Sequence, residues 1–118
     1  MAEAALFIGW GEAVRGRAKA SLDFFNESMQ FWQRLQDEGR IERFDLVFLR
    51  PHGGDLSGFV LMRGTAQQID SLKRADDVMQ SMERARLRVE GFGVVDAFVD
   101  EGIARGMAHY VNAVEELE

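Results

Sequence analysis

The chain has no cysteine and only one proline in its 118 residues. Without cysteine there are no disulfides, no thiolate metal sites and no cysteine nucleophile, and a reducing cytoplasm is the expected location. The near absence of proline, together with the lack of any low-complexity run, argues against disorder and against an interdomain linker. We therefore expect one folded domain spanning residues 1–118.

Long apolar runs and excess positive charge are also missing. No stretch approaches the ~20 apolar residues that a membrane helix needs. The first residues, MAEAALFIGWGEA, lack a basic region and carry Glu3, so we expect no signal peptide. The net charge of −6 opposes nucleic-acid binding, which requires a basic surface. We expect neither a membrane nor a nucleic acid as partner.

The residues that are present alternate between strand and helix patterns, and 47% of them are hydrophobic. Strands are predicted at about residues 4–10, 41–50, 57–64 and 89–99. Helices are predicted at about 21–38, with a start near Arg17 as the alternative, and after a capping box at Thr65, with a break at Asp76-Asp77. A third helix is predicted at about 102–117. The order is βαββαβ plus a terminal helix, an α+β class in which a core of about residues 4–99 forms a four-stranded antiparallel sheet with two main helices on one face.

The second and third strands read as a hairpin around PHGGD. A two-residue turn at Gly53-Gly54 would pair Phe48 with Phe59 and Val47 with Val60. This register sets apolar side chains opposite each other on both sides, which favours it over a shifted one.

All four strands carry apolar side chains on both faces, although helices cover only one face of such a sheet. At about 25 cal/mol per Å² of apolar surface, a bare second face would forgo several kcal/mol and form a sticky patch. A second copy in a twofold dimer is the simplest cover. The alternative is that the C-terminal helix folds over this face.

Several segments together carry a resemblance to a known superfamily: the ALFIGW strand, the FFNESMQFWQRL helix that ends at Gly39, the PHGGD hairpin and the LKRADDVMQSMERA helix. With the element order, they make the chain similar to the dimeric α/β-barrel superfamily of ferredoxin-like proteins over residues 4–99. That superfamily includes cofactorless monooxygenases, haem-degrading enzymes, muconolactone isomerases and small bacterial proteins of unknown role. The resemblance implies a homodimer, a ligand between sheet and helices or inside the barrel, and proton-transfer or oxygen chemistry without a tightly encoded cofactor. No subfamily motif transfers a named catalytic residue.

Asp96 is the first candidate for a catalytic side chain, because it interrupts an apolar strand. A buried carboxylate needs a partner or a raised pKa, and Arg63 is the expected partner. A structural ion pair is the simpler interpretation of the same two residues.

His52 is the second candidate, because it lies three residues from Asp55 across the glycine turn. The pair could act as a base and its orienting carboxylate. A turn in which His52 hydrogen-bonds Asp55 or the turn backbone is the favoured interpretation. His109, the other histidine, is predicted to face solvent, and no ligand spacing indicates a metal or cofactor site.

Arg15 and Arg17 are candidate ligand-binding residues in the glycine-containing segment after the first strand. This segment fails as a dinucleotide fingerprint, because Val14 occupies the third glycine position, and it also fails as a phosphate loop. Cations near a helix N-terminus are disfavoured by the helix dipole, and an anionic ligand would offset that cost. A solvated basic loop is the simpler interpretation.

Trp10 could line an aromatic pocket, although aromatic stripes at helical spacing are more often core.

Three functions stay open on the sequence alone. The chain could bind or convert a small organic molecule in an apolar cavity lined by Trp10. It could be a non-catalytic sensor or accessory module, or a structural dimer without a ligand.

Overall fold

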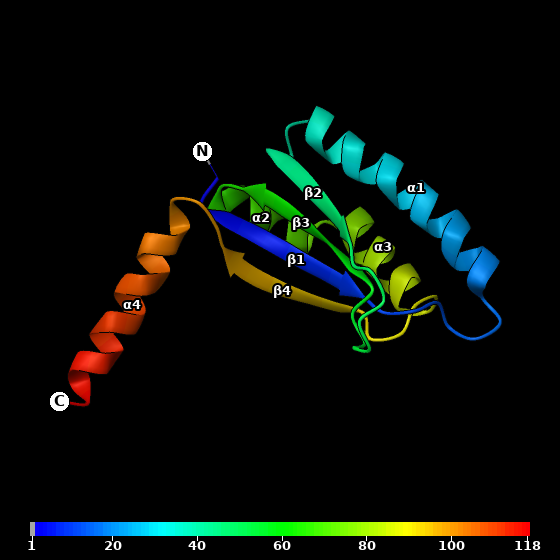
Figure 1. Cartoon of the computed structure of the whole chain (residues 1–118). Helices are drawn as coiled ribbons and strands as arrows, with labels where there is room; N and C mark the ends of the chain where they lie inside the picture. Colours follow the sequence, from blue (N-terminus) through cyan, green and yellow to red (C-terminus); the bar gives the residue numbers. More distant parts are fainter. Residues whose placement is uncertain (1) are drawn as a thin grey trace.

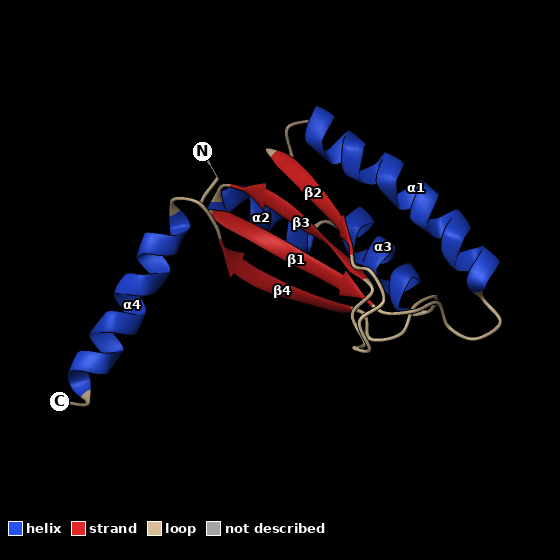
Figure 2. Cartoon of the chain, viewed as in Figure 1, coloured by secondary structure: helices blue, strands red, loops and turns tan. Residues whose placement is uncertain are grey.

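The computed structural model describes residues 2–118 as one sheet with helices (Figures 1 and 2). The strands are β1 (Ala4–Trp10), β2 (Arg43–Phe48), β3 (Gly58–Gly64) and β4 (Gly93–Phe98). The helices are α1 (Ala18–Asp37), α2 (Ala66–Arg74), α3 (Asp76–Arg86) and α4 (Gly102–Glu116). The predicted βαββαβ order with an additional C-terminal helix is confirmed.

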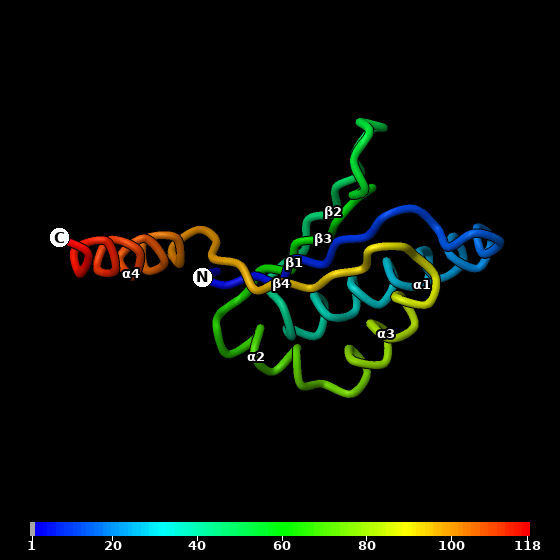
Figure 3. Tube along the Cα trace, turned by 90° about the horizontal axis from the view of Figure 1, so that it is seen from below, coloured from blue at the N-terminus to red at the C-terminus, as the bar shows by residue number. Residues whose placement is uncertain are grey.

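The strands form one antiparallel sheet in the order β2-β3-β1-β4. Helices α1, α2 and α3 lie on one side of it, as Figure 3 shows. The fold thus has two layers, and its core lies between the helices and the sheet. The buried core side chains are Leu6, Ile8, Trp32, Leu35, Ile41, Val60, Met62, Ile69, Leu72 and Val78.

Local sequence signals set several of the helix ends as predicted. Thr65 accepts a hydrogen bond from the Gln68 backbone and Gln68 accepts one from the Thr65 backbone, a complete capping box. Ala75 adopts an extended conformation between α2 and α3, so the break predicted at the two aspartates is confirmed. Gly39 takes a φ of +74° after α1, which a residue with a side chain rarely adopts.

The predicted hairpin register is wrong by one residue. Val47 pairs with Phe59 and Phe48 pairs with Gly58, and residues 49–57 form a longer loop instead of a two-residue turn. Alternation failed to distinguish the registers because both faces of these strands are apolar, so either pairing sets hydrophobic side chains opposite each other.

The face of the sheet opposite the helices is apolar, as predicted, although its members differ. Phe59 and Leu61 lie there, whereas Val60 and Met62 are in the core. We call this surface the open face, and its apolar members are Phe7, Val47, Phe59, Leu61, Val95 and Ala97. The rings of Phe7 and Phe59 stack on it with centroids 4.9 Å apart.

Helix α4 does not cover the open face. It extends beyond the end of the sheet, away from the other helices (Figures 1 and 3). Its apolar side chains are all exposed: Ile103, Met107, Tyr110, Val111, Val114 and Leu117. The alternative in which the C-terminal helix covers the sheet is therefore wrong for the single chain.

Candidate functional site

A cavity of about 310 Å³ lies between the sheet and helices α1 and α3. This volume is at the lower end of the range for small-molecule sites, ~300–1,000 Å³. The lining consists of Ile8, Trp10, Ala18, Ser21, Leu22, Phe24, Phe25, Ser28, Phe31, Trp32, Leu35, Phe48, Met62, Val78, Ser81, Met82, Ala85, Val89 and Phe92. Every one of these side chains is apolar or a serine, so the lining contains no ionisable group.

Aromatic rings from three elements form one wall of the cavity. Trp10 on β1 and Trp32 on α1 stack at a centroid distance of 6.3 Å. Phe25 on α1 meets Trp32 edge-on at 6.1 Å and Phe48 on β2 at 5.2 Å. Trp10, Trp32 and Phe25 each contact more than one ring, which favours a rigid wall, whereas Phe48 contacts Phe25 and is exposed.

Ser28 is the one buried polar residue among residues 2–118, with 5% of its surface exposed. It lies in the middle of the α1 stripe that packs on the core, and it lines the cavity. Ser21 on α1 and Ser81 on α3 also line it. The three hydroxyls, with the indole N–H groups of the two lining tryptophans, are thus the side-chain polar groups of the lining.

A polar groove of about 210 Å³ adjoins the cavity between α1 and α3. The two hollows share Phe24, Ser28, Phe31 and Ser81. Across the groove, Arg84 of α3 donates two hydrogen bonds, of 3.1 and 3.0 Å, to the Glu27 carboxylate of α1.

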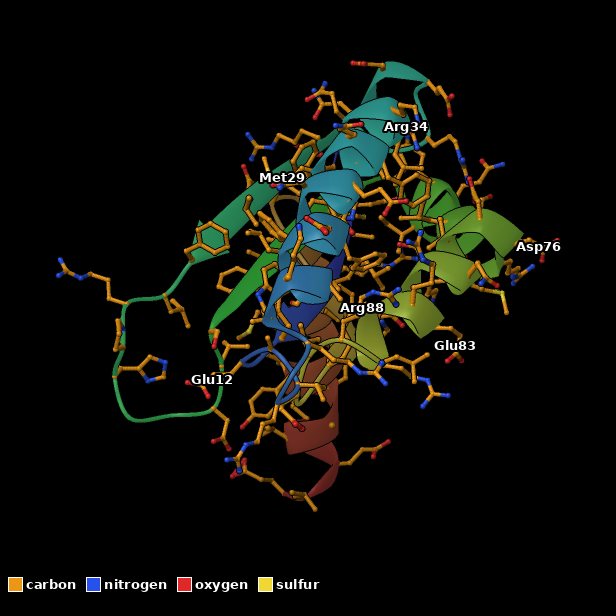
Figure 4. All side chains as sticks on the ribbon, turned by 90° about the vertical axis from the view of Figure 1, so that its right-hand side faces the viewer. Glu12, Met29, Arg34, Asp76, Glu83 and Arg88 are labelled. Carbon is orange, nitrogen blue, oxygen red and sulfur yellow. The ribbon has the colours of Figure 1, made fainter. Side chains whose placement is uncertain are left out.

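Two guanidinium groups lie over one aromatic ring at this groove. The Arg84 and Arg88 Cζ atoms are 4.8 and 5.1 Å from the centroid of Phe24, within cation–π distance. Figure 4 looks onto α1 and α3 and labels Arg88 and Arg34 near this side of the molecule. The hydrogen bond from Arg84, together with the charges of Arg84, Arg88 and Arg34, holds the pKa of Glu27 below its ordinary value.

Backbone pairing before β4 positions Arg88. The Gly11 N–H donates to the Glu90 carbonyl at 2.7 Å, and the Glu90 N–H donates to the Glu12 carbonyl at 2.7 Å. Val14 N–H donates to the Arg88 carbonyl at 2.9 Å. The segment after β1 is therefore joined to the segment after α3, which places the Arg88 side chain beside α1.

The structure does not bring Asp96 and Arg63 together. Asp96 is on the helix side of β4, where Lys73 of α2 approaches its carboxylate at 3.1 Å. Arg63 is on the open face. The predicted pair is wrong because strand alternation sends the two side chains to opposite sides of the sheet. A catalytic role for either residue stays a prediction.

Arg63 forms an ion cluster at one end of the open face. Its Nε donates to Asp45 at 2.7 Å and its Nη1 donates to Asp100 at 3.2 Å. The hydrogen bond with Asp45 is the main cause that raises the pKa of Arg63. Asp100, with a φ of +48°, connects β4 to α4, so this cluster joins β2, β3 and the start of the C-terminal helix.

The histidines do not meet each other or a carboxylate. The Gly54 N–H donates to His52 Nδ1 at 3.2 Å, and His52 Nε2 lies 2.9 Å from the Leu56 carbonyl. His52 thus bonds the turn backbone, as the favoured interpretation predicted; a catalytic role for it stays a prediction. His109 is exposed on α4, as predicted.

Of the three predicted ligand-binding residues, Trp10 alone lines the cavity. Arg15 is exposed, and Arg17 is exposed and donates to the Leu87 carbonyl at 3.2 Å. α1 begins at Ala18, so the alternative start near Arg17 is confirmed and the start at Ser21 is wrong. An anion-binding role for the two arginines stays a prediction.

Sequence reasoning missed Glu27 and Arg84, which line the groove, and Arg88 beside it. Nothing in their local sequence distinguishes them from solvated helix charges. Ser28 did carry a signal, because a serine inside the stripe of Phe24 and Phe31 interrupts an otherwise apolar helix face.

Among residues 2–118, no group of three or more histidine and acidic side chains is arranged to hold a metal ion. Within the same residues, no helix has both the length and the apolar character required to cross a bilayer.

No family model and no curated protein matches this sequence. A similar solved structure is a crystal structure from Bacteroides fragilis, described as a dimeric protein of unknown function and ferredoxin-like fold. The two chains superpose with a TM-score of 0.60 at 9% sequence identity, over 81% of this chain and 96% of the other. At this identity the likeness concerns the fold, and this chain has the ferredoxin-like fold.

Proposed function

We propose that the protein is a homodimer that binds a small, largely apolar organic molecule in the cavity between the sheet and helices α1 and α3. The observation that carries this proposal is the cavity itself, which has about 310 Å³ of space with aromatic walls and three hydroxyls. An apolar lining with few polar groups is the usual composition of a small-molecule site.

Binding is better supported than acid–base conversion. A general acid or base must approach within about 2.6–3.2 Å of the proton it transfers, or act through one water. The lining residues are apolar or serine, and the nearest charged groups belong to the adjoining groove. This composition favours a carrier or sensor over the isomerase-like chemistry that the superfamily resemblance implies.

The two tryptophans offer a direct test, because the chain has only two and both line the cavity. Intrinsic fluorescence is measured while small aromatic and aliphatic compounds are titrated into the protein. A ligand in the cavity is expected to change the emission of Trp10 and Trp32 and to saturate. In parallel, a ligand at 100 times its Kd is expected to add about 2.7 kcal/mol to the free energy of unfolding.

A matched pair of variants locates the binding. Ser28→Leu places an apolar side chain in the cavity, whereas Ser71→Leu makes the same change on the exposed surface of α2. Loss of the fluorescence response in the first variant and its retention in the second supports the proposal. An unchanged response in both variants would place binding elsewhere and overturn it.

The homodimer part of the proposal rests on the open face. Its apolar side chains remain accessible in the single chain, and Val95 is 58% exposed. The similar structure from Bacteroides fragilis is described as dimeric. A twofold axis would place this self-complementary surface against the same surface of a second copy.

Helix α4 extends the same interface in this proposal. It follows β4 directly, and Arg63 of the open face donates to Asp100, just before the first turn of this helix. Its apolar stripe has no cover within the chain. A second copy seated on the open face is therefore expected to contact α4 as well.

Val95→Glu tests the dimer by light-scattering mass, with Met79→Glu on the exposed surface of α3 as control. Both residues are more than one-third exposed, at 58% and 50%, so neither change should disrupt the subunit. We expect twice the chain mass of 13.3 kDa for the wild type and the control, and the single-chain mass for Val95→Glu, because two unpaired carboxylates would be buried. A monomeric wild type, or a Val95→Glu dimer of unchanged stability, would contradict the proposal.

A further inference from the structure

The groove beside the cavity carries more positive than negative charge. Arg34 and Arg84 line it together with Glu27, which is bound to Arg84, and Arg88 lies beside it over the ring of Phe24. The other carboxylate that lines the groove, Asp77, is engaged by two hydrogen bonds from Arg40, of 2.8 and 2.9 Å. One carboxylate is thus left to balance three guanidinium groups.

This local excess stands out because the whole chain is acidic, with a net charge of −6. Neither Arg34 nor Arg88 forms a salt bridge with a carboxylate among residues 2–118; both instead lie over phenylalanine rings of α1. Arg84 and Arg88 lie over the same ring of Phe24, and the single Glu27 carboxylate bound to Arg84 offsets only part of the repulsion between these like charges.

The groove and the cavity are continuous through shared lining residues, among them Phe24 and Ser28. A molecule in the cavity would therefore have the arginines of the groove at one of its ends. Arg88 is also held in place, since its Nη1 donates to the Arg84 carbonyl at 2.8 Å.

We propose that the natural ligand is an amphipathic carboxylate, with an apolar body in the cavity and its carboxylate at the Arg84 and Arg88 guanidinium groups. This inference rests on the proposed function, because it names the class of ligand for the same cavity. Arg88 has no carboxylate partner among residues 2–118, whereas Arg84 already donates two hydrogen bonds to Glu27, so Arg88 is the main hydrogen-bond donor to the ligand and Arg84 adds its charge.

Glu27 gives a model of the anion within the protein. Its carboxylate already receives two hydrogen bonds from Arg84, which is the arrangement that the ligand carboxylate would adopt with these arginines. Glu27 then competes with the ligand for positive charge, and removing its charge should tighten binding.

The size of the cavity limits the apolar body. If each non-hydrogen atom occupies about the volume of one water in the liquid, ~30 Å³, the cavity holds roughly ten such atoms. A phenylalkanoate is a suitable probe, and 3-phenylpropanoate can be compared with 3-phenylpropanamide, which has the same shape without the charge.

Affinities of both probes are measured by tryptophan fluorescence for the wild type and for Arg88→Gln, Glu27→Gln and, as control, the exposed Arg74→Gln on α2. In the wild type, the acid is expected to bind about tenfold more tightly than the amide, the effect of one charge-assisted hydrogen bond. Arg88→Gln should remove this advantage, Glu27→Gln should increase it, and Arg74→Gln should leave it unchanged. The advantage should also shrink in high salt.

Each outcome distinguishes the two proposals. Equal binding of acid and amide, unaffected by Arg88→Gln, would overturn the carboxylate inference and leave the apolar cavity as the site. Absence of binding by either probe would count against both proposals. If Arg88→Gln is destabilised, Arg34→Gln provides the same comparison from the other end of the groove, since the Arg34 side chain is solvent-facing on α1.

Discussion

Replacing Ser28 with leucine should make the protein more stable while it abolishes ligand binding. Ser28 is 5% exposed, and it lies on the wall of a cavity of about 310 Å³. The leucine side chain can therefore enter space that the surrounding side chains do not fill.

The magnitude follows from the apolar surface gained. Leucine replaces one hydroxyl with three carbon atoms, and a buried methylene contributes about 0.8 kcal/mol. Leucine is also the better helix former, by a few tenths of a kcal/mol. Imperfect packing reduces this sum, and we expect the free energy of unfolding to rise by about 1–2 kcal/mol.

Urea unfolding of wild type, Ser28→Leu and the surface control Ser71→Leu at one protein concentration measures the change. A fixed concentration is required because dimerisation contributes to the apparent stability. The control reports helix propensity alone and should change the free energy of unfolding by less than about 0.5 kcal/mol. If Ser28→Leu instead costs 1–3 kcal/mol, the usual penalty for overpacking, the cavity does not exist as described.

Three further predictions concern the frame around the site. Thr65→Ala should lower the free energy of unfolding by about 1 kcal/mol, because α2 loses the side chain of its capping box, and urea unfolding measures it. Gly102→Ala should destabilise the start of α4, because a Cβ there would lie 1.7 Å from the Glu3 carbonyl oxygen. Amide hydrogens at the start of α4 should then exchange faster with solvent. An unchanged exchange rate would contradict this contact. The hydrogen bonds from Arg40 lower the pKa of Asp77, so this pair should stabilise the fold above the ordinary aspartate value of 3.8 and lose its effect as the pH falls below it. Wild type and Asp77→Asn should differ in free energy of unfolding by less than about 1 kcal/mol, because the pair is half exposed. This difference should disappear in acid. A difference that grows in acid would contradict a stabilising pair of Arg40 and Asp77.

The element order could be predicted from the sequence because each element carries its own local signal. The capping box at Thr65, the break before Asp76 and the glycine after α1 are all short-range features, and all three are confirmed. Periodicity also predicted correctly that the sheet has two apolar faces.

The same apolar character hid the pairing of β2 with β3. When Val47 can oppose either Val60 or Phe59 without setting a polar group against an apolar one, the pattern contains no information on register. The error set Val60 and Phe59 opposite the wrong residues of β2, whereas the prediction that the sheet is apolar on both sides is confirmed.

The candidate site was harder to predict, because it is formed by residues far apart in the sequence. Glu27 and Arg84 are 57 positions apart, and they meet only because α1 and α3 lie side by side on the sheet. Asp96 was predicted as a site residue because it is a polar residue within an apolar strand. In the structure its carboxylate instead forms an ion pair with Lys73. Trp10 lines the cavity because it shares the helix-facing side of β1 with Leu6 and Ile8, an alternation that the sequence shows.

The central claim is that the cavity beneath α1 and α3 takes up a small molecule, and the indole N–H signals of the two tryptophans in a ¹H–¹⁵N NMR spectrum test it most directly. Addition of 3-phenylpropanoate should shift both indole signals, with backbone shifts confined to α1, α3 and the adjoining ends of β1 and β2. Shifts restricted to the open face or to α4, with both indole signals unmoved at saturating ligand, would contradict the account.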